Sequence, residues 1–376
     1  MRVGLLTGGG DCPGLNAVLR AVGKSLLLQC DAEILGFEEG FLGMIERRAR
    51  NLSYRDLSGI LNLGGTILGT HNRANPFDFY GAGGEDVSDS VVEYVQELGL
   101  DCVVALGGDG TMSICHALAE KGVPFVGVPK TIDNDLMATE RTFGFDTAVS
   151  IATDAIDRLQ TTGQSHQRIM ILETMGRYTG WLAMHAGIAG GADIILIPEV
   201  PYDLEEVARV CRMREAKQKF TIIVIAEGAK PKDGQMVVRE VDDSSPDPIR
   251  LGGVANVLRN QLEEITYSEI RSMVLGHIQR GGSPTAFDRV FATNLGCYAA
   301  SLVASGKTNR MVAVHDNRLT SVALADVADK TRVVPTDHPA IASAMAIGTS
   351  FGDPDLLRPL AALKDGASIS HGLIDG

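Results

Sequence analysis

The chain has 376 residues, of which 45% are hydrophobic, and its net charge is −13. This length allows two domains with large apolar cores, and the acidic charge without a lysine- or arginine-rich stripe argues against nucleic acid as a partner. No apolar run reaches the roughly 18 residues of a membrane-spanning helix, and the start at Met1 lacks a signal-peptide pattern. The six cysteines lack CxxC spacing. We therefore expect a cytoplasmic protein with no membrane partner and with reduced, mostly buried thiols.

Short apolar runs alternate with glycine-rich turns and amphipathic helices along most of the chain. We predict strands over 3–7, 33–37, 101–106, 124–128, 168–172, 194–197 and 221–226. Helices are predicted over 15–28, from the GGDGT turn to Glu120, and over 341–347. Continuous Val/Ile/Leu runs between helices are typical of α/β folds with parallel sheets covered on both faces. Segments 230–235 and 241–248 are expected to be loops, and 366–376 a mobile end.

Two glycine-rich turns follow predicted strands. The turn from Gly8 to Gly14 lies between a strand and a helix, where free backbone amides can hold an anion, although a tight strand-to-helix turn has the same composition. In the second turn, 107–111, Asp109 offers a hard oxygen ligand for Mg²⁺ and Thr111 is expected to cap the next helix. Alternatively, Asp109 is only an acidic residue favoured by the helix dipole.

The third polar segment, 129–135, follows the strand at 124–128. In an extended chain, the side chains of Thr131, Asp133 and Asp135 would point the same way. Such spacing suits one carboxylate as a base and the other as an orienting group or metal contact, but structural Asp–Asn turns share it.

Arginines and one histidine stand beside later glycine turns, which suits recognition of a phosphomonoester by guanidinium groups. Lone surface arginines are usually solvated, and an isolated histidine is more often structural. The residues concerned are Arg168, Arg177, Arg271, His277 and Arg280.

Six motifs occur in the order and approximate spacing of the 6-phosphofructokinase family: TGGGDCPGLN, GGDGT, PKTIDND, MGR, AEG and LGHIQRGG. The resemblance covers residues 2–335, and the combination is specific, although GGDGT alone also occurs in NAD and diacylglycerol kinases. It implies Mg²⁺-dependent transfer of a phosphoryl group from ATP to the 1-hydroxyl of fructose 6-phosphate, giving fructose 1,6-bisphosphate in glycolysis. The alternative is a reversible, pyrophosphate-dependent phosphotransferase. The implied fold is two Rossmann-like three-layer α/β lobes with mainly parallel sheets and the active site in the cleft between them.

The resemblance also implies roles for individual residues. Asp133 corresponds to the general base that takes the proton of the 1-hydroxyl, Asp135 assists near the metal, and Asp109 binds Mg²⁺; Thr131 and Arg177 complete the implied catalytic set. The implied donor-binding residues are Gly10, Arg73, Gly108, Asp109, Gly110, Thr111 and Lys130. The implied fructose 6-phosphate residues are Thr131, Asp133, Arg168, Met175, Gly176, Arg177, Glu227, Arg271, His277 and Arg280.

The implied lobes set expectations for domains and assembly. Residues 1–144 with about 279–306 would form the donor lobe, and 145–278 with about 307–335 the fructose 6-phosphate lobe, leaving 336–376 as a C-terminal extension. Family members assemble as tetramers or dimers, and Arg168 and Arg271 resemble arginines that reach a neighbouring subunit's site. The family's effector cluster is matched only in part, at Arg20, because Gln160 stands where an arginine is expected.

Two positions help to distinguish ATP from pyrophosphate as the phosphoryl donor. Pyrophosphate-using relatives usually have lysine at the position of Lys130 and aspartate at that of Gly110, whereas ATP-using bacterial enzymes usually have glycine at the first. Since an added carboxylate would exclude the α-phosphate of ATP and a lysine would not, Gly110 favours ATP. A catalytically silent sensor of sugar phosphates or nucleotides is a third reading, and the intact Asp109, Asp133 and Arg177 argue for an enzyme instead.

Overall fold

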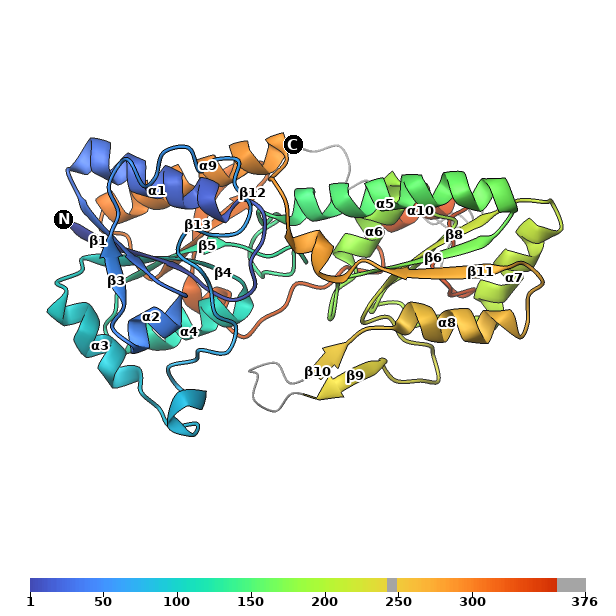
Figure 1. Cartoon of the computed structure of the whole chain (residues 1–376), viewed down its shortest axis with the longest axis horizontal. Coiled ribbons are helices and arrows are strands. Elements are labelled where there is room, and N and C mark those ends of the chain that lie inside the picture. Colours follow the sequence, from blue (N-terminus) through green and yellow to red (C-terminus); the bar gives the residue numbers. More distant parts are fainter. Residues whose placement is uncertain (242–248, 357–376) are drawn as a thin grey trace, which may run out of the picture. The chain divides into compact units, whose positions relative to one another are not determined.

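The computed structural model of the chain describes residues 1–241 and 249–356 (Figure 1). The predicted mobile end at 366–376 and nearly all of the predicted loop at 241–248 lie outside this range. The chain divides into two compact units. The first contains Met1–Thr147 and Arg280–Arg332, and the second contains Ala148–Val241, Ile249–Gln279 and the described residues from Val333 onward.

Seven described strands of the first unit form one sheet in the order β13-β12-β5-β4-β1-β2-β3. Its inner neighbours are parallel, and the pairs β12–β13 and β2–β3 at the edges are antiparallel. The bounds are β1 Arg2–Thr7, β2 Glu33–Phe37, β3 Ala49–Asn51, β4 Cys102–Gly107, β5 Phe125–Pro129, β12 Arg310–His315 and β13 Arg318–Ala323.

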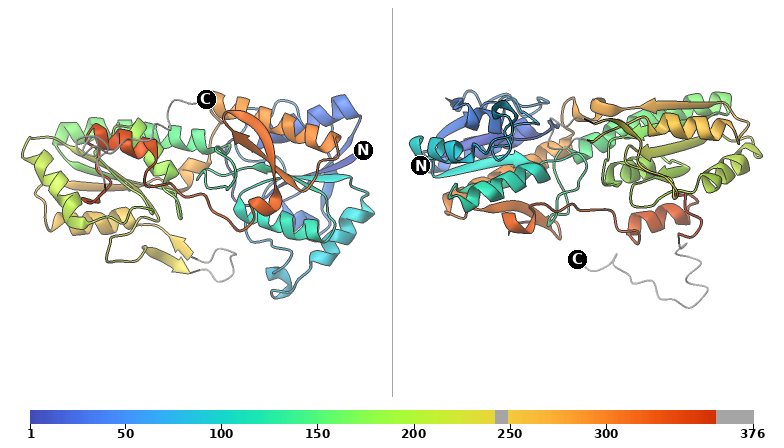
Figure 2. Two further views of the ribbon diagram at one scale, coloured as in Figure 1. Left: turned by 180° about the vertical axis from the view of Figure 1, so that it is seen from behind. Right: turned by 90° about the horizontal axis from the view of Figure 1, so that it is seen from below.

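Helices cover both faces of this sheet (Figures 1 and 2). The first face carries α1 Leu15–Cys30 and α9 Ala286–Ala304, which pack side by side so closely that Gly296 lies against the backbone of α1. The opposite face carries α2 Phe41–Ile45, α3 Ser88–Glu97 and α4 Asp109–Glu120, whose apolar residues share one core with the strands. Two 3₁₀ turns, η1 Tyr80–Ala82 and η3 Leu324–Asp326, complete the described part of this unit.

The second unit is built on a parallel sheet in the order β11-β6-β8-β7. Helices α7 and α8 bury their apolar side chains on one face, and α5 and α6 lie on the other, where Gly163 and Gly187 approach the strands. The bounds are α5 Phe145–His166, β6 Ile169–Thr174, α6 Trp181–Ala189, β7 Ile194–Leu196, α7 Leu204–Glu215, β8 Thr221–Ala226, β9 Val238–Val241, β10 Ile249–Leu251, α8 Val254–Glu263, β11 Ile270–Val274, η2 Gly276–Arg280 and α10 Pro339–Ala346. Strands β9 and β10 form a separate antiparallel pair.

The division of the chain differs from the predicted lobe boundaries in one stretch. Residues 307–332 were expected in the second lobe, but β12 and β13 extend the first sheet beside β5. The described part of the expected C-terminal extension packs within the second unit, where Ser350 forms a parallel bridge to Ile194 at the edge strand β7. The described part of the extension therefore lies beside the edge of the second sheet.

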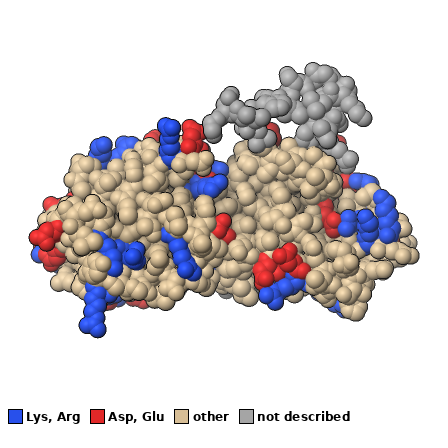
Figure 3. Space-filling view, turned by 90° about the horizontal axis from the view of Figure 1, so that it is seen from above, with Lys and Arg blue, Asp and Glu red and all other residues tan. Residues whose placement is uncertain are grey.

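The α/β fold class predicted from the sequence is confirmed, with two units that each contain a mainly parallel sheet between helices. Four of the six cysteines are buried, and all six are free thiols, as predicted. None of the described helices is long and apolar enough to span a membrane. On the face drawn in Figure 3, basic side chains are interspersed with acidic ones.

Candidate functional site

Three of the predicted motifs follow three strands that are neighbours in the first sheet. Strands β1, β4 and β5 are parallel, so their carboxyl ends lie at the same edge. The first turn begins after Thr7, the GGDGT turn contains the end of β4, and Lys130 follows the last residue of β5. Sites in α/β folds form at this edge of the sheet, so the topology brings the motifs of the first unit together.

The first turn approaches its neighbours closely. The Gly8 amide donates to the carbonyl of Leu106 at 2.9 Å, which ties the turn to β4. Gly14 precedes α1 with a φ of 107°, a conformation that favours glycine. A Cβ at Gly10 would lie 2.9 Å from the guanidinium of Arg280, whose Nη1 donates to the Asp11 carbonyl at 3.3 Å. Arg280, predicted as a sugar-phosphate residue, thus lies in the first unit beside the predicted donor turn.

The second turn differs from expectation in its cap. Thr111 was expected to cap α4, but the helix begins at Asp109, and Gly108 occupies the cap position without a side-chain hydrogen bond. Thr111 is instead buried in the first helical turn, where its side chain fills the space above Gly8 and Gly107. Threonine therefore acts here through packing, whereas Asp109 and Gly110 are exposed.

The third motif is a turn rather than the extended segment that the sequence suggested. Asn134 has a φ of 51°, and its buried side chain accepts a hydrogen bond from the Thr142 amide at 3.0 Å. The Thr131 hydroxyl accepts from the Asp133 amide at 3.0 Å. Alternation of side chains in an extended strand therefore does not explain how Asp133 and Asp135 are placed; left-handed Asn134 does.

Electrostatics link these turns. Burial, followed by the charges of Asp133 and Asp109, raises the pKa of Asp135 to about 7, although a hydrogen bond with Thr131 opposes the shift. Lys130 is buried, and this burial lowers its pKa. Its ammonium donates to the Gly10 carbonyl at 2.5 Å. Three carboxylates and a buried ammonium therefore share one electrostatic environment at the sheet edge.

The remaining predicted donor residue of the first unit is Arg73. Its guanidinium lies 5.1 Å from the ring centroid of Tyr80, and Tyr80 stacks on His71 with centroids 5.5 Å apart. The Arg73 amide donates to Nδ1 of His71 at 3.2 Å. Arg73 is therefore held by the segment between β3 and α3, in which the sequence analysis predicted no element.

In the second unit, the predicted sugar-phosphate residues follow β6 and β8. Met175, Gly176 and Arg177 come directly after β6, and Glu227 directly after β8. The Glu227 amide donates to the Thr174 carbonyl at 2.9 Å, so the two segments begin side by side. His277 lies exposed in η2, and the guanidinium of Arg177 lies 5.7 Å from the ring centroid of Tyr178.

Three residues that support these segments were missed. Buried Gln279 accepts from the Met175 amide at 3.4 Å and donates to the Gly276 carbonyl at 3.0 Å. Buried Glu173 accepts from the amides of Gly253 and Ala255, both at 2.9 Å, at the start of α8. In the first unit, the Arg332 amide donates to the Asp135 carbonyl at 2.7 Å. Gln279 stands inside a recognised motif, and a buried carboxylate beside MGR could have been noticed, but the sequence gives no signal for Arg332.

Arg168 and Arg271, predicted to act across a subunit interface, converge on one carboxylate. Both guanidinium groups are paired with Glu269, and the hydrogen bond from Arg168 is the largest cause of its lowered pKa. Strands β6 and β11 are parallel neighbours, so residues at their starts lie close together. The two arginines therefore form one basic group at the amino ends of β6 and β11, opposite in the sheet to the ends that carry Arg177 and Glu227.

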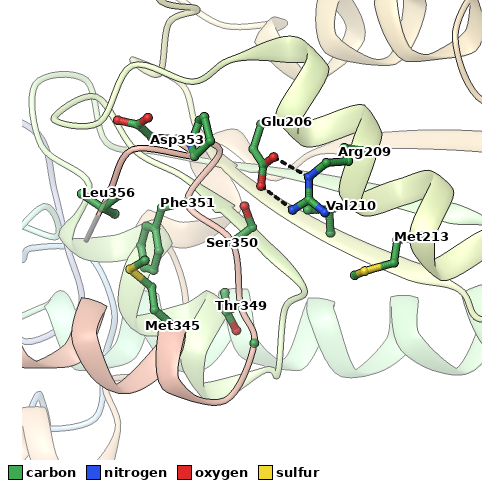
Figure 4. A pocket seen from close by; sticks show the side chains of 12 residues that line it. Glu206, Arg209, Val210, Met213, Met345, Thr349, Ser350, Phe351, Asp353 and Leu356 are labelled. Atoms are coloured by element: carbon green, nitrogen blue, oxygen red, sulfur yellow. Dashed lines mark hydrogen bonds and ion pairs between the residues drawn. The ribbon is translucent and has the colours of Figure 1, made fainter. Parts of the chain in front are cut away.

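The described residues contain no preformed metal cage at the site. A cavity of about 70 Å³ lies within the second unit between α7 and the segment that contains Thr349 and Phe351, and it includes no predicted site residue (Figure 4). No group of three or more His, Cys, Asp or Glu side chains in the described residues is arranged to hold a metal ion. The charges of Asp133 and Asp109 thus act on Asp135, but the three carboxylates do not form a preformed metal cage.

Comparison with known proteins gives consistent results. Residues 2–303 match the family model described as "Phosphofructokinase". The chain is 48% identical over 360 residues to the "ATP-dependent 6-phosphofructokinase 2" of Clostridium perfringens, covering 94% of this chain and 98% of that protein. It is 46% identical over 338 residues to the "Pyrophosphate--fructose 6-phosphate 1-phosphotransferase" of Amycolatopsis methanolica, covering 90% and 97%.

Among solved structures, the T-state phosphofructokinase of Pichia pastoris resembles the chain with a TM-score of 0.75 and 27% identity. The likeness covers 94% of this chain and 38% of that longer one. The family model spans most of the chain, and the relatives are matched over nearly their whole length. The chain therefore belongs to the phosphofructokinase family.

Proposed function

We propose that this protein transfers a phosphoryl group from ATP to the 1-hydroxyl of fructose 6-phosphate, giving fructose 1,6-bisphosphate. One observation carries the proposal: a shared group of three carboxylates and a buried lysine, together with two glycine turns, lies at the adjacent ends of β1, β4 and β5 in a member of this family. The names of relatives at 48% and 46% identity support fructose 6-phosphate as the acceptor. One of these names refers to ATP and the other to pyrophosphate.

Asp133 is the proposed general base. Its backbone is fixed by the Thr131 hydroxyl and by the left-handed Asn134, so that the carboxylate belongs to a rigid turn. Burial and the charges of Asp133 and Asp109 raise the pKa of Asp135. The proposal gives the two carboxyl groups separate roles, with Asp133 as the base and Asp135 beside the metal. A positioned base of this kind contributes roughly 10²–10⁴ in rate.

Mg²⁺ is the proposed cofactor, held by Asp109 with Asp135 nearby. The fit rests on the repulsion among Asp109, Asp133 and Asp135, which a bound cation would relieve. The lack of a preformed cage among the described residues agrees with the usual binding of Mg²⁺ by one or two carboxylates together with phosphate oxygens. When bound, Mg²⁺ would neutralise charge on the transferred phosphoryl group.

The proposed donor residues are Gly10, Arg73, Lys130 and the turn from Gly108 to Thr111. The exposed first turn of α4 offers its amides and positive dipole to the donor phosphates. The proposed sugar-phosphate residues are Thr131, Met175, Gly176, Arg177, Glu227, His277 and Arg280, with Arg168 and Arg271 supplied by a neighbouring chain in a homo-oligomer.

ATP is the favoured donor because Gly110 leaves open space: a Cβ there would meet no atom within 4 Å. An aspartate would fill this space with negative charge, whereas the lysine at 130 is already engaged with the Gly10 carbonyl. Pyrophosphate remains the second candidate donor, supported by the relative from Amycolatopsis methanolica.

The test is a direct measurement of fructose 1,6-bisphosphate formed by the purified protein from fructose 6-phosphate and Mg²⁺, with ATP and with pyrophosphate in parallel. We expect ATP-driven turnover that a metal chelator abolishes. Asp133→Ser, prepared in the same way, should lose about 10²–10⁴ in kcat and keep its affinity for fructose 6-phosphate.

Fast turnover with pyrophosphate and negligible turnover with ATP would show that the donor assignment is wrong. Absence of product with both donors would refute the proposed function. Near-normal turnover of Asp133→Ser would remove Asp133 from the mechanism.

A further inference from the structure

Two turns of the second unit are joined through their backbones. Thr174, the last residue of β6, pairs with Ala226, the last residue of β8. Beyond this pair the hydrogen bonding continues, because the Gly228 amide donates to the Gly176 carbonyl at 3.1 Å. The turn that carries Arg177 and the turn that carries Glu227 are therefore held against each other.

Gly228 is the point of closest approach. A Cβ at this position would lie 1.8 Å from the carbonyl oxygen of Arg177 and 2.7 Å from its carbonyl carbon. Both atoms belong to the backbone, so no side-chain rotation could relieve the clash. Gly228 is not among the glycines with positive φ. Alanine could therefore adopt its backbone conformation, and glycine is needed here for the contact alone.

We propose that Gly228 is a positioning residue for fructose 6-phosphate, which acts by allowing the Arg177 turn to rest on the β8 turn. This inference rests on the proposed function, in which Arg177 and Glu227 contact the sugar phosphate. Gly228 sets the distance between these two groups, because both turns are anchored on paired strand ends and their backbones approach most closely at this residue.

The size of the effect follows from the geometry. To bring the contact from 1.8 Å to an acceptable 3.0 Å, the Arg177 carbonyl would have to move by about 1.2 Å. A displacement of about 1 Å at a site can reduce the reaction rate about 10²-fold. The proposed donor residues belong to the first unit, so an effect confined to these turns should spare donor binding.

The experiment compares wild type with Gly228→Ala and with a matched control, Gly187→Ala. Gly187 is buried in α6 of the same unit, and its added Cβ would meet side-chain atoms of Ile195 at 2.7 Å rather than a backbone turn. For each protein we would measure the melting temperature, kcat, the KM of each substrate, and the Kd of fructose 6-phosphate by calorimetry without a donor.

Gly228→Ala should raise the Kd and KM of fructose 6-phosphate at least about tenfold and leave the KM of ATP within about twofold. Gly187→Ala should change the melting temperature without changing either KM. If Gly228 acts through Arg177, the double variant Arg177→Ala/Gly228→Ala should bind fructose 6-phosphate no more weakly than Arg177→Ala alone.

A second variant covers the case in which Gly228→Ala does not fold. Ala226→Val enlarges the side chain whose Cβ lies 3.5 Å from the position of a Cβ at Gly176, so the added methyl groups would crowd the same turn. It should raise the Kd of fructose 6-phosphate selectively and to a smaller extent.

Unchanged affinity for fructose 6-phosphate in a folded Gly228→Ala protein would overturn the inference, as would equal losses for both substrates or additive losses in the double variant. These results differ from failure of the proposed function, in which wild type itself would neither bind nor phosphorylate fructose 6-phosphate.

Discussion

Gly110 lies exposed in the first turn of α4, with no atom within 4 Å of the position that a Cβ would take. The fold therefore has room for a side chain here, and Gly110→Asp should change donor use without unfolding the protein. Its carboxylate would repel the α-phosphate of ATP in a partly dehydrated site. We expect kcat/KM for ATP to fall about 10²-fold or more, with the melting temperature nearly unchanged.

Lys130→Gly is the comparison for this prediction. Removing the buried ammonium should reduce ATP-driven turnover less than Gly110→Asp does, because the proposed Mg²⁺ and Arg73 would remain as positive partners of the donor. Steady-state kinetics with ATP, alongside circular dichroism to confirm folding, measure both variants. A Gly110→Asp protein that uses ATP as well as wild type would remove Gly110 as the determinant of donor choice.

Asp135 gives a prediction for the pH dependence of stability. Its pKa in the fold is raised from 3.8 to about 7, so between these pH values the folded state binds more protons at Asp135 than the unfolded state does. The free energy of unfolding therefore falls, through Asp135, as the pH rises from about 4 to about 7. Asp135→Asn removes that loss, and the variant should melt at a higher temperature than wild type at pH 8, with little difference at pH 4.

Thermal unfolding across this pH range tests the prediction, and Asp326→Asn on η3 serves as an exposed control that should show no such trend. A difference between Asp135→Asn and wild type that does not grow with pH would contradict the raised pKa. Asp135→Asn should also lose activity, since the proposed metal contact is removed.

At the residue scale, the motifs identified which side chains to examine but not how the backbone holds them. The spacing of Thr131, Asp133 and Asp135 suggested an extended segment, whereas Asn134 turns the chain. The role of Thr111 was predicted from local helix-capping preferences, and packing against two glycines overrides them. Arg332 contacts the turn from far along the chain, and no local pattern predicts such a contact.

At the element scale, strands with continuous apolar runs were mostly predicted, including the three-residue β7, whereas the buried strand β12 was missed. Strand β8 has the predicted bounds, because six consecutive apolar or β-branched residues are buried. Edge strand β11 was missed, since its side chains are mostly exposed and its sequence lacks a continuous apolar run. Helix α10 was predicted within two residues at its start and one at its end.

The segment after α10 was not assigned a structure, yet it is part of the second unit. The Ile195 amide donates to the Ser350 carbonyl at 2.8 Å, and the Asp203 amide donates to the Gly352 carbonyl at 2.7 Å. Phe351 lies between these contacts and is 1% exposed, and it lines the same cavity as Val210 of α7 (Figure 4). The segment therefore covers the edge of β7 and contributes to the core.

Phe351→Ala should consequently destabilise the second unit by about 3–5 kcal/mol, the usual effect of removing a buried aromatic ring. Ile347→Ala in the same segment is the matched control, because Ile347 is 81% exposed and should contribute little. Urea unfolding followed by circular dichroism measures both variants. Equal stability of the two would show that the segment after α10 does not belong to the folded core.

At the scale of the whole molecule, the six motifs divide between two units that the sequence does not delimit correctly. The alternation of strands and helices is similar in both, so composition did not show that 307–332 join the first sheet. Assignment to a sheet depends on pairing between distant strands, here β12 with β5. The pattern of apolar and polar residues along the chain predicts helices and strands, whereas the choice of which strands pair depends on tertiary packing.

The assembly provides the last prediction. Arg168 and Arg271 are paired with Glu269 within one chain, on the opposite end of β6 from Arg177. If they complete a neighbouring chain's site, each site combines Asp133 of one chain with Arg168 of another. Arg168→Ala and Asp133→Ser should each lose activity alone. Mixed and reassembled in equal amounts, they should recover about a quarter of wild-type turnover, the share of sites that random pairing leaves intact.

The control mixture combines Asp133→Ser with Gly110→Asp. Both changes lie in the first unit and affect the same chain's site, so no combination of chains restores an intact one. Activity of reassembled protein, after exchange is verified by mass spectrometry of the mixed oligomers, separates the two cases. No recovery with Arg168→Ala despite verified exchange would place Arg168 outside the composite site, because only a residue supplied by the neighbouring chain can be complemented in this way. Recovery in the control would contradict the premise that Asp133 and Gly110 act in the same chain's site.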